Sequence, residues 1–382
     1  MFCKVRKKEP KHGRDGILAR QENGQAALRP RPSKWHWLLQ LGMALCVILA
    51  GVASPANALM FGMASQPLSD ASPIGSPFWR AAQAEMALLT VAYLCAAAAI
   101  FVSRLPLRGK APWRTLLPAR GLERWHVARA GVGFVAFVLL FVGAAWLLEH
   151  DESIARVSVY GNAGGLFFVI GTYIWLRRRS SAYARRSTRL DVACALVAAA
   201  AMVWMVGVAS LAWIDLLLLV AALTLGGLPY LQARLSADEQ AELARIRGTD
   251  ELGALDKLYV SMGIAQWTCV FGGVVSGGIF AATAVVGGGL RSLPQQAVLP
   301  ALGLVLGYAV YQVCTQLGFG LGNSTLMSIV CMSAVFPGYP INARFGNGDP
   351  VQPRHFVALA IISLAFSISA LKKAREGRRT KP

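Results

Sequence analysis

Charged residues, and acidic ones above all, are scarce in this sequence. Only 15% of its 382 residues are charged, and 19 aspartates and glutamates stand against 38 lysines and arginines. Soluble domains are about a quarter charged. Hydrophobic residues make up 55% of the chain, and its mean hydropathy is +0.49. A water-soluble fold cannot bury so large an apolar share, so the sequence predicts a polytopic protein of the lipid bilayer.

Other absences exclude most enzyme classes. The seven cysteines form no CxxC or CxxH pair, and no histidine lies in the middle of an apolar run, which argues against a metal site or a disulfide framework. There is no GxxxxGK[ST] loop for the phosphates of ATP. Ser276 lacks the Gly-x-Ser-Gly spacing of intramembrane serine proteases, because Val274 stands at the first glycine position. We therefore expect no enzyme activity, no metal and no cofactor.

Long apolar runs are what the sequence has in abundance. A helix of about 20 residues crosses the roughly 30 Å hydrocarbon core of a bilayer, and a helix that is apolar on all sides belongs in lipid. We therefore expect an all-α protein with ten transmembrane helices, at residues 37–62, 79–103, 128–148, 156–176, 190–208, 211–231, 259–284, 296–315, 322–342 and 354–372.

The positive charge is distributed between these runs and is not gathered in one stretch. With ten spans, 33 of the 38 lysines and arginines fall on the side that holds both chain ends, and the other five are Arg80, Arg156, Arg291, Arg344 and Arg354. Cytoplasmic loops of membrane proteins carry such an excess. We therefore expect cytoplasmic N- and C-termini, and the net charge of +19 does not indicate nucleic acid binding.

Polar segments divide the chain. Residues 1–35 are predicted to form a basic, disordered cytosolic tail, and residues 373–382 a second basic tail. The spans between them form two halves, 37–208 and 209–372. Within the second half, the loop at 232–258 has helical charge spacing and is expected to form a short cytosolic amphipathic helix, either as a linker or as a segment that binds a partner.

Five spans per half is an odd number, so a duplicated half would insert upside down. Inverted repeats of this kind are common in secondary transporters, with the binding site at their interface. Short matches support a duplication: Gly161-Asn162-Ala163 opens the fourth span, and Gly322-Asn323-Ser324 opens the ninth, its counterpart. The predicted fold class is two inverted five-helix repeats.

Three segments carry a resemblance to a known family. They are GVASPANAL (51–59) in the first span, SPFWRAAQAEMALL (76–89) at the second, and LGYAVYQVCTQLGFGLGNSTLMSIV (306–330) across the eighth and ninth. With the order and orientation of the spans, they make residues 37–372 similar to the drug/metabolite transporter superfamily, in particular to its EamA-like ten-span members.

The resemblance implies two inverted halves around a central cavity and export of a small metabolite or drug. With the Ala- and Arg-rich composition, it also implies a bacterial inner membrane. The chain departs from the family pattern in that the fourth span lacks a central proline, and Glu85 stands near the position of a common arginine. The residues after the fourth and ninth spans, Arg177-Arg178-Arg179 and Asn347-Gly348-Asp349, replace a common glutamate. The chain is therefore similar to a divergent branch.

Polar side chains within the spans are the candidate binding residues. Glu85 is a carboxyl at membrane depth, where ionisation is costly, so it can bind a proton or pair with a cation; it is our candidate for proton coupling. Amides and hydroxyls can bond a solute in a cavity or hold helices together, and tyrosines can stack on an apolar solute or anchor a span end. The candidates for the cavity are Asn57, Glu85, Asn162, Tyr308, Tyr311, Gln312, Asn323 and Ser324.

Two function classes follow from these observations. The first is a secondary transporter that moves a small organic solute by alternating access, with or without proton coupling. The alternative is a membrane scaffold that transports nothing and recruits partners through its basic tail and the loop at 232–258. The sequence leaves the solute, the direction of transport and the oligomeric state open, and a homodimer is among the states that it allows.

Overall fold

The computed structural model describes residues 36–72, 74, 77–109, 111–149, 155–176, 187–206, 213–249, 251–288, 294–337, 340 and 351–379. The predicted N-terminal tail lies outside these residues, as do the arginine run after the fourth span, the boundary between the fifth and sixth spans, and the Asn-Gly-Asp loop.

In the described part of the chain every regular element is a helix, which confirms the all-α fold. The first half contains α2 (His36–Asp70), α3 (Pro77–Arg104), α4 (Glu123–Glu149), α5 (Ala155–Trp175) and α6 (Arg189–Val206), with the short 3-10 helices η1 (Pro106–Arg108) and η2 (Trp113–Leu116). The second half contains α7 (Trp213–Leu225), α8 (Leu228–Arg247), α9 (Ala254–Gly287), α10 (Gln295–Leu321), α11 (Ser324–Cys331), η3 (Met332–Val335) and α13 (Pro353–Arg379).

Each predicted apolar run overlaps a helix, and the sixth run overlaps two, α7 and the start of α8. Seven helices among the described residues are long and apolar enough to cross a membrane, and Gln40–Ala53 and Ser324–Val335 are shorter apolar helices. The ninth run is the most interrupted, because α11 has eight residues and passes into η3 before Pro337. Proline has no N–H to donate and ends regular helical bonding.

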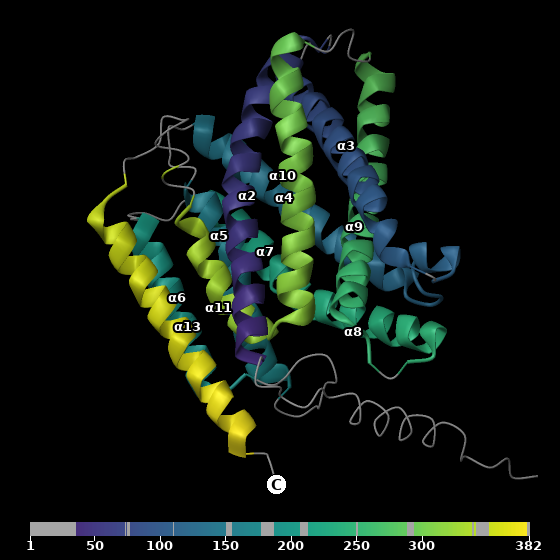
Figure 1. Cartoon of the computed structure of the whole chain (residues 1–382). Helices are drawn as coiled ribbons and strands as arrows, with labels where there is room; N and C mark the ends of the chain where they lie inside the picture. Colours follow the sequence, from purple (N-terminus) through teal and green to yellow (C-terminus); the bar gives the residue numbers. More distant parts are fainter. Residues whose placement is uncertain are drawn as a thin grey trace, which may run out of the picture.

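The helices form one bundle with two ends (Figure 1). The start of α2, the helix α8 and the end of α13 lie at one end, which we call the α8 end; the other is the opposite end. The helix pairs that pack most extensively are α2 with α10, α3 with α9, and α6 with α13. Small residues permit this closeness, as in α3, where Ala84, Ala92 and Ala96 are buried against neighbouring helices.

Helices α5 and α11 approach each other most closely at Gly165. A Cβ atom at this position would overlap the backbone carbonyl oxygen of Ser328 in α11. The neighbouring Gly164 is also packed tightly, against Leu225 at the end of α7. Gly164 and Gly165 are therefore packing residues of a contact among α5, α7 and α11.

Residues 232–247 of the loop at 232–258 lie in a helix, as the charge spacing predicts, and residues 254–258 already belong to α9. Helix α8 packs against the bundle and buries Leu235, Ser236 and Leu243. Its Glu239 lies 2.9 Å from Nε2 of the buried His126 in α4. The charge pattern indicated the helix, but the buried face could not be recognised without its partner helices.

Candidate functional site

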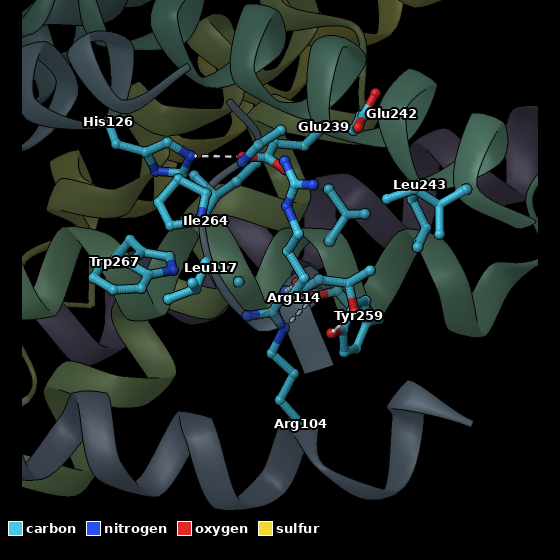
Figure 2. A pocket seen from close by; sticks show the side chains of 16 residues that line it. Arg104, Arg114, Leu117, His126, Glu239, Glu242, Leu243, Tyr259, Ile264 and Trp267 are labelled. Carbon is cyan, nitrogen blue, oxygen red and sulfur yellow. Dashed lines mark hydrogen bonds and ion pairs between the residues drawn. The ribbon is translucent and has the colours of Figure 1, made fainter. Parts of the chain in front are cut away.

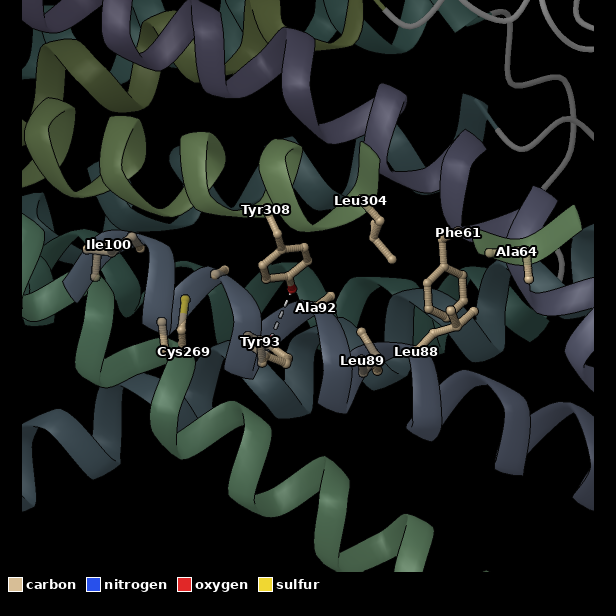
Figure 3. Packing of buried hydrophobic residues seen from close by; sticks show 14 of the residues in the cluster. Phe61, Ala64, Leu88, Leu89, Ala92, Tyr93, Ile100, Cys269, Leu304 and Tyr308 are labelled. Carbon is tan, nitrogen blue, oxygen red and sulfur yellow. Dashed lines mark hydrogen bonds between the residues drawn. The ribbon is translucent and has the colours of Figure 1, made fainter. Parts of the chain in front are cut away.

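A cluster of polar side chains lies in the middle of the bundle, among α3, α4, α9 and α10. Tyr308 donates a hydrogen bond from its hydroxyl to that of Tyr93, at 3.0 Å, with the rings edge to face (Figure 3). The two tyrosines are 5% and 4% exposed. Tyr93 can lie flat on α9 because Gly272 has no side chain there. We call Tyr93, Arg129, Thr268, Cys269, Tyr308 and Tyr311 the central cluster.

Arg129 is the only charged member of this cluster. Its guanidinium is 3% exposed and donates from Nη1 to the hydroxyl of Thr268. The other groups that interact with it electrostatically are Tyr93, Cys269 and Tyr311. Its Nε is buried without a hydrogen-bond acceptor. Within the described residues, Arg129 has no carboxylate at ion-pair distance.

Several residues predicted for the cavity lie in or beside the central cluster. Tyr308 and Tyr311 are members. Gln312 is buried one helical turn beyond Tyr308 and makes no hydrogen bond with the described residues. The buried Asn57 of α2 lies directly against Gly307, next to Tyr308, and its Oδ1 has no donor.

Asn162 connects the cluster to α11. Its amide nitrogen donates to the carbonyl oxygen of Ser158 at 2.8 Å, and its Oδ1 accepts from the thiol of Cys331 at 3.3 Å. Cys331 in turn interacts with Tyr311. Asn162 therefore links α5 with α11 at the edge of the site.

The remaining predicted residues lie away from the centre. Glu85 precedes Tyr93 by eight residues, which is about 12 Å along α3 toward the opposite end, and it makes no hydrogen bond or ion pair with the described residues. Asn323 caps α11 at the α8 end, where its Oδ1 accepts from the N–H of Leu326 and from Lys373. The hydroxyl of Ser324 donates to the carbonyl oxygen of Phe319, near the end of α10.

The α8 end of the bundle is closed by a polar network. Asp191 of α6 is buried and accepts from the backbone of Thr188 and from the hydroxyl of Ser369 in α13. Lys373 lies 3.6 Å from the same carboxylate and donates to Asn323. This network holds α6, α11 and α13 together below the central cluster.

Different contacts close the opposite end. Arg156 of α5 and Asp215 of α7 are both buried and lie 3.8 Å apart, and Gln83 of α3 donates to the carbonyl oxygen of Gly288 after α9. Arg156 was counted as an outside charge in the sequence, but it is 6% exposed and paired. Between these two ends, Tyr93, Arg129, Cys269 and Tyr308 of the central cluster are buried, whereas Tyr311 is half-buried.

A small pocket at the α8 end has a structural role. Arg104, Tyr259, Glu239 and His126 line it (Figure 2), and its volume of about 40 Å³ is far below that of a ligand site. Arg104 donates there to the carbonyl oxygens of Tyr259, Leu116 and Thr115. All three nitrogens of its guanidinium are therefore used, two on η2 and one on α9, and they fix the η2 segment against α9.

A larger groove of about 580 Å³ lies between α2, α11 and α13. Its lining is mainly apolar, with Leu45, Ile48 and Phe366 among the residues that form it. It contains no charged side chain among its lining residues. The groove therefore offers a hydrophobic surface, and the polar chemistry of the bundle lies in the central cluster.

The hydrogen bond between the two tyrosines should have a measurable energy. We expect Tyr308→Phe to reduce the free energy of unfolding by about 1 kcal/mol, since one buried hydrogen bond is lost without creating a cavity. Tyr93→Phe should cost a similar amount, and the double variant should cost less than the sum. Reversible unfolding of the purified protein in mixed detergent micelles measures this cycle. Strict additivity of the two substitutions would contradict the bond.

Comparisons with known proteins give a fold and no family. No protein-family model matches the chain, and no curated protein matches it. Thirteen chains of solved structures do match it. One crystal structure aligns with a TM-score of 0.56, covering 87% of this chain and 98% of its own, at 14% sequence identity. At that identity the likeness concerns fold alone: this chain resembles a solved protein in the arrangement of its helices.

Proposed function

We propose that the chain is a secondary transporter of a bacterial inner membrane that carries a small organic solute through the central cluster by alternating access. The observation that carries this proposal is the buried Arg129 beside Tyr93 and Tyr311, on the inside of a bundle that different polar contacts hold together at its two ends. Ionisable groups within membrane proteins mark substrate pathways by default. A scaffold that binds its partners at the surface has no need of a charged side chain in the interior of the bundle.

The proposal includes ten spans in two inverted halves. The packing of the helices supports this arrangement. If α2, α3, α4, α5 and α6 are exchanged for α7, α9, α10, α11 and α13, the pair α2–α10 becomes α7–α4, and both pairs pack together. The pair α5–α7 likewise becomes α11–α2, and α5–α6 becomes α11–α13. The pairs α3–α9 and α6–α13 exchange into themselves, as two elements on a pseudo-two-fold axis do.

Glu85 is our candidate for proton coupling. It has no partner among the described residues and lies on α3, which also carries Tyr93. A carboxyl that opens to one side of the membrane at a time can take up a proton there and release it on the other. Coupling would then link the protonation of Glu85 to the movement of α3 against α9.

Solute flux tests the proposed function. The purified protein is reconstituted in liposomes with an imposed pH gradient and offered amino acids, nucleosides, organic acids and cationic dyes. We expect flux of at least one class that depends on the gradient, and its loss in Glu85→Gln. Flux that survives this substitution keeps the transporter and removes Glu85 from the mechanism. Absence of flux across the whole panel, with folded protein, would contradict transport.

A second pair of variants separates transport from a scaffold role. Asn162→Leu should reduce flux, because it removes the link between the cluster and α11, whereas deletion of residues 1–35 should leave flux unchanged. Both variants are first compared with the wild type for yield and thermal stability. Loss of cellular function only on deletion of the tail would favour the scaffold.

A further inference from the structure

Three buried arginines of this bundle have very different surroundings. Arg104 is 4% exposed and uses its guanidinium on three backbone carbonyls and on Gln266. Arg156 is paired with Asp215. Arg129 is as deeply buried, but a single hydroxyl, that of Thr268, accepts from it. Of the three, Arg129 alone has neither a carboxylate nor a carbonyl partner among the described residues.

An unpaired guanidinium in this position calls for a counter-ion. Burying a charge without compensation is costly, and the cost is higher still in a bilayer. The neighbours of Arg129, namely Tyr93, Cys269 and Tyr311, are neutral groups that soften this cost without removing it. An anion that occupies the cluster for part of the transport cycle would remove it.

Starting from the proposed function, we infer that the transported solute is an organic carboxylate and that Arg129 binds its carboxyl group. A guanidinium offers two parallel N–H donors that match the two oxygens of a carboxylate. The Nε of Arg129, which lacks an acceptor here, is one of the donors of such a fork.

The rest of the cluster fits the body of such a solute. Tyr93 and Tyr311 interact with Arg129, and the rings of Tyr93 and Tyr311 both lie against that of Tyr308, with centroids 4.8 Å and 6.2 Å from it. Gln312 adds an amide that has no hydrogen-bond partner among the described residues. The combination of one cation, three aromatic rings and one free amide is suited to a carboxylate with an apolar or aromatic body and one polar group.

Matched pairs of solutes test the inference independently of flux. N-acetylphenylalanine, N-acetylleucine and N-acetylglutamine are each compared with the corresponding amide, in which a neutral CONH₂ replaces the carboxylate. Binding to the native protein raises its unfolding temperature in detergent. For at least one pair, we expect the acid to raise this temperature and to bind at least tenfold more tightly than its amide. Inorganic phosphate serves as a control anion that has no organic side chain.

Substitutions test whether Arg129 is responsible for the preference for the acid over the amide. Arg129→Gln should abolish the difference between acid and amide. Arg129→Lys should retain a weaker one, because it keeps the charge and loses the fork. Arg114→Gln removes a charge from an exposed position after α3 and should behave as the wild type. If Arg129→Gln does not fold, Arg129→Lys still decides, because wild-type discrimination in that variant would overturn the role of the fork.

The outcomes distinguish this inference from the transporter itself. No preference for the acid in any pair, or a preference that Arg129→Gln retains, overturns the carboxylate assignment even if neutral or cationic solutes are transported. Binding of phosphate through Arg129 with no acid bound would also overturn it. Absence of flux for every solute, with acid binding intact, would instead overturn the transport proposal.

Discussion

Replacement of Gly165 by alanine is expected to lower the free energy of unfolding by about 1–3 kcal/mol, the cost of an overpacked site. The added methyl group would meet the backbone carbonyl of Ser328, which cannot rotate away as a side chain can. To accommodate it, α5 and α11 must separate, and the bond between Asn162 and Cys331 across the same interface would be strained or lost.

Gly171 supplies a matched control on the same helix. It lies less than two turns beyond Gly165, and a Cβ atom there has nothing within 4 Å. Gly171→Ala should therefore be neutral or stabilising, by up to about 1 kcal/mol, because alanine favours the helix more than glycine does. Reversible unfolding in mixed micelles compares the two variants. Equal stability of Gly165→Ala and Gly171→Ala would contradict the close contact of α5 with α11.

Replacement of Arg104 by methionine is expected to have the largest effect on stability, about 3 kcal/mol or more. The apolar stem is preserved, but the carbonyl oxygens of Tyr259, Leu116 and Thr115 lose their donor in a buried site. The guanidinium also lies 4.1 Å from the centre of the Tyr259 ring, and this attraction is lost with it.

The stability of Arg104→Met is best compared with that of Arg129→Gln, because both variants remove a buried guanidinium. Arg129→Gln removes a charge that has a single hydroxyl acceptor, so it should keep the fold and lose ligand binding. Arg104→Met should lose stability first. Thermal unfolding and size-exclusion chromatography of both variants, beside Arg114→Gln, measure the contrast. A folded, fully stable Arg104→Met would show that the network around η2 does not hold the bundle together.

The positions of the helices could be predicted from the sequence because lipid imposes a simple requirement. Every backbone polar group must be bonded within its own segment, so a long apolar run becomes a helix. Two helices begin at positions that the apolar runs do not indicate. Helix α8 begins at Leu228, inside the predicted sixth span, after a turn at Gly226 and Gly227. The short α11 begins at Ser324, and the side chain of the preceding Asn323 caps it.

The candidate site could be predicted only in part. Tyr308 and Tyr311 were recognised because they lie within an apolar run, and Asn162 because it interrupts one. Arg129 was counted among the charges of a cytoplasmic loop, since it lies close to the start of its span. One signal was present: no acidic residue stands three or four positions from it, where a helical ion pair would form. Its burial depends on α9 and α10, far away in sequence.

Access of water to the central cluster tests the account most directly. Cys269 lies in this cluster with 0% exposure, whereas Cys95 is exposed on the outside of the bundle, where lipid would cover it. In variants that retain one of these cysteines, a charged, membrane-impermeant thiol reagent is applied to either face of reconstituted vesicles. Alternating access predicts slow modification of Cys269 from both faces and none of Cys95. A Cys269 that stays unmodified from both faces in folded protein would contradict a transport pathway through the central cluster.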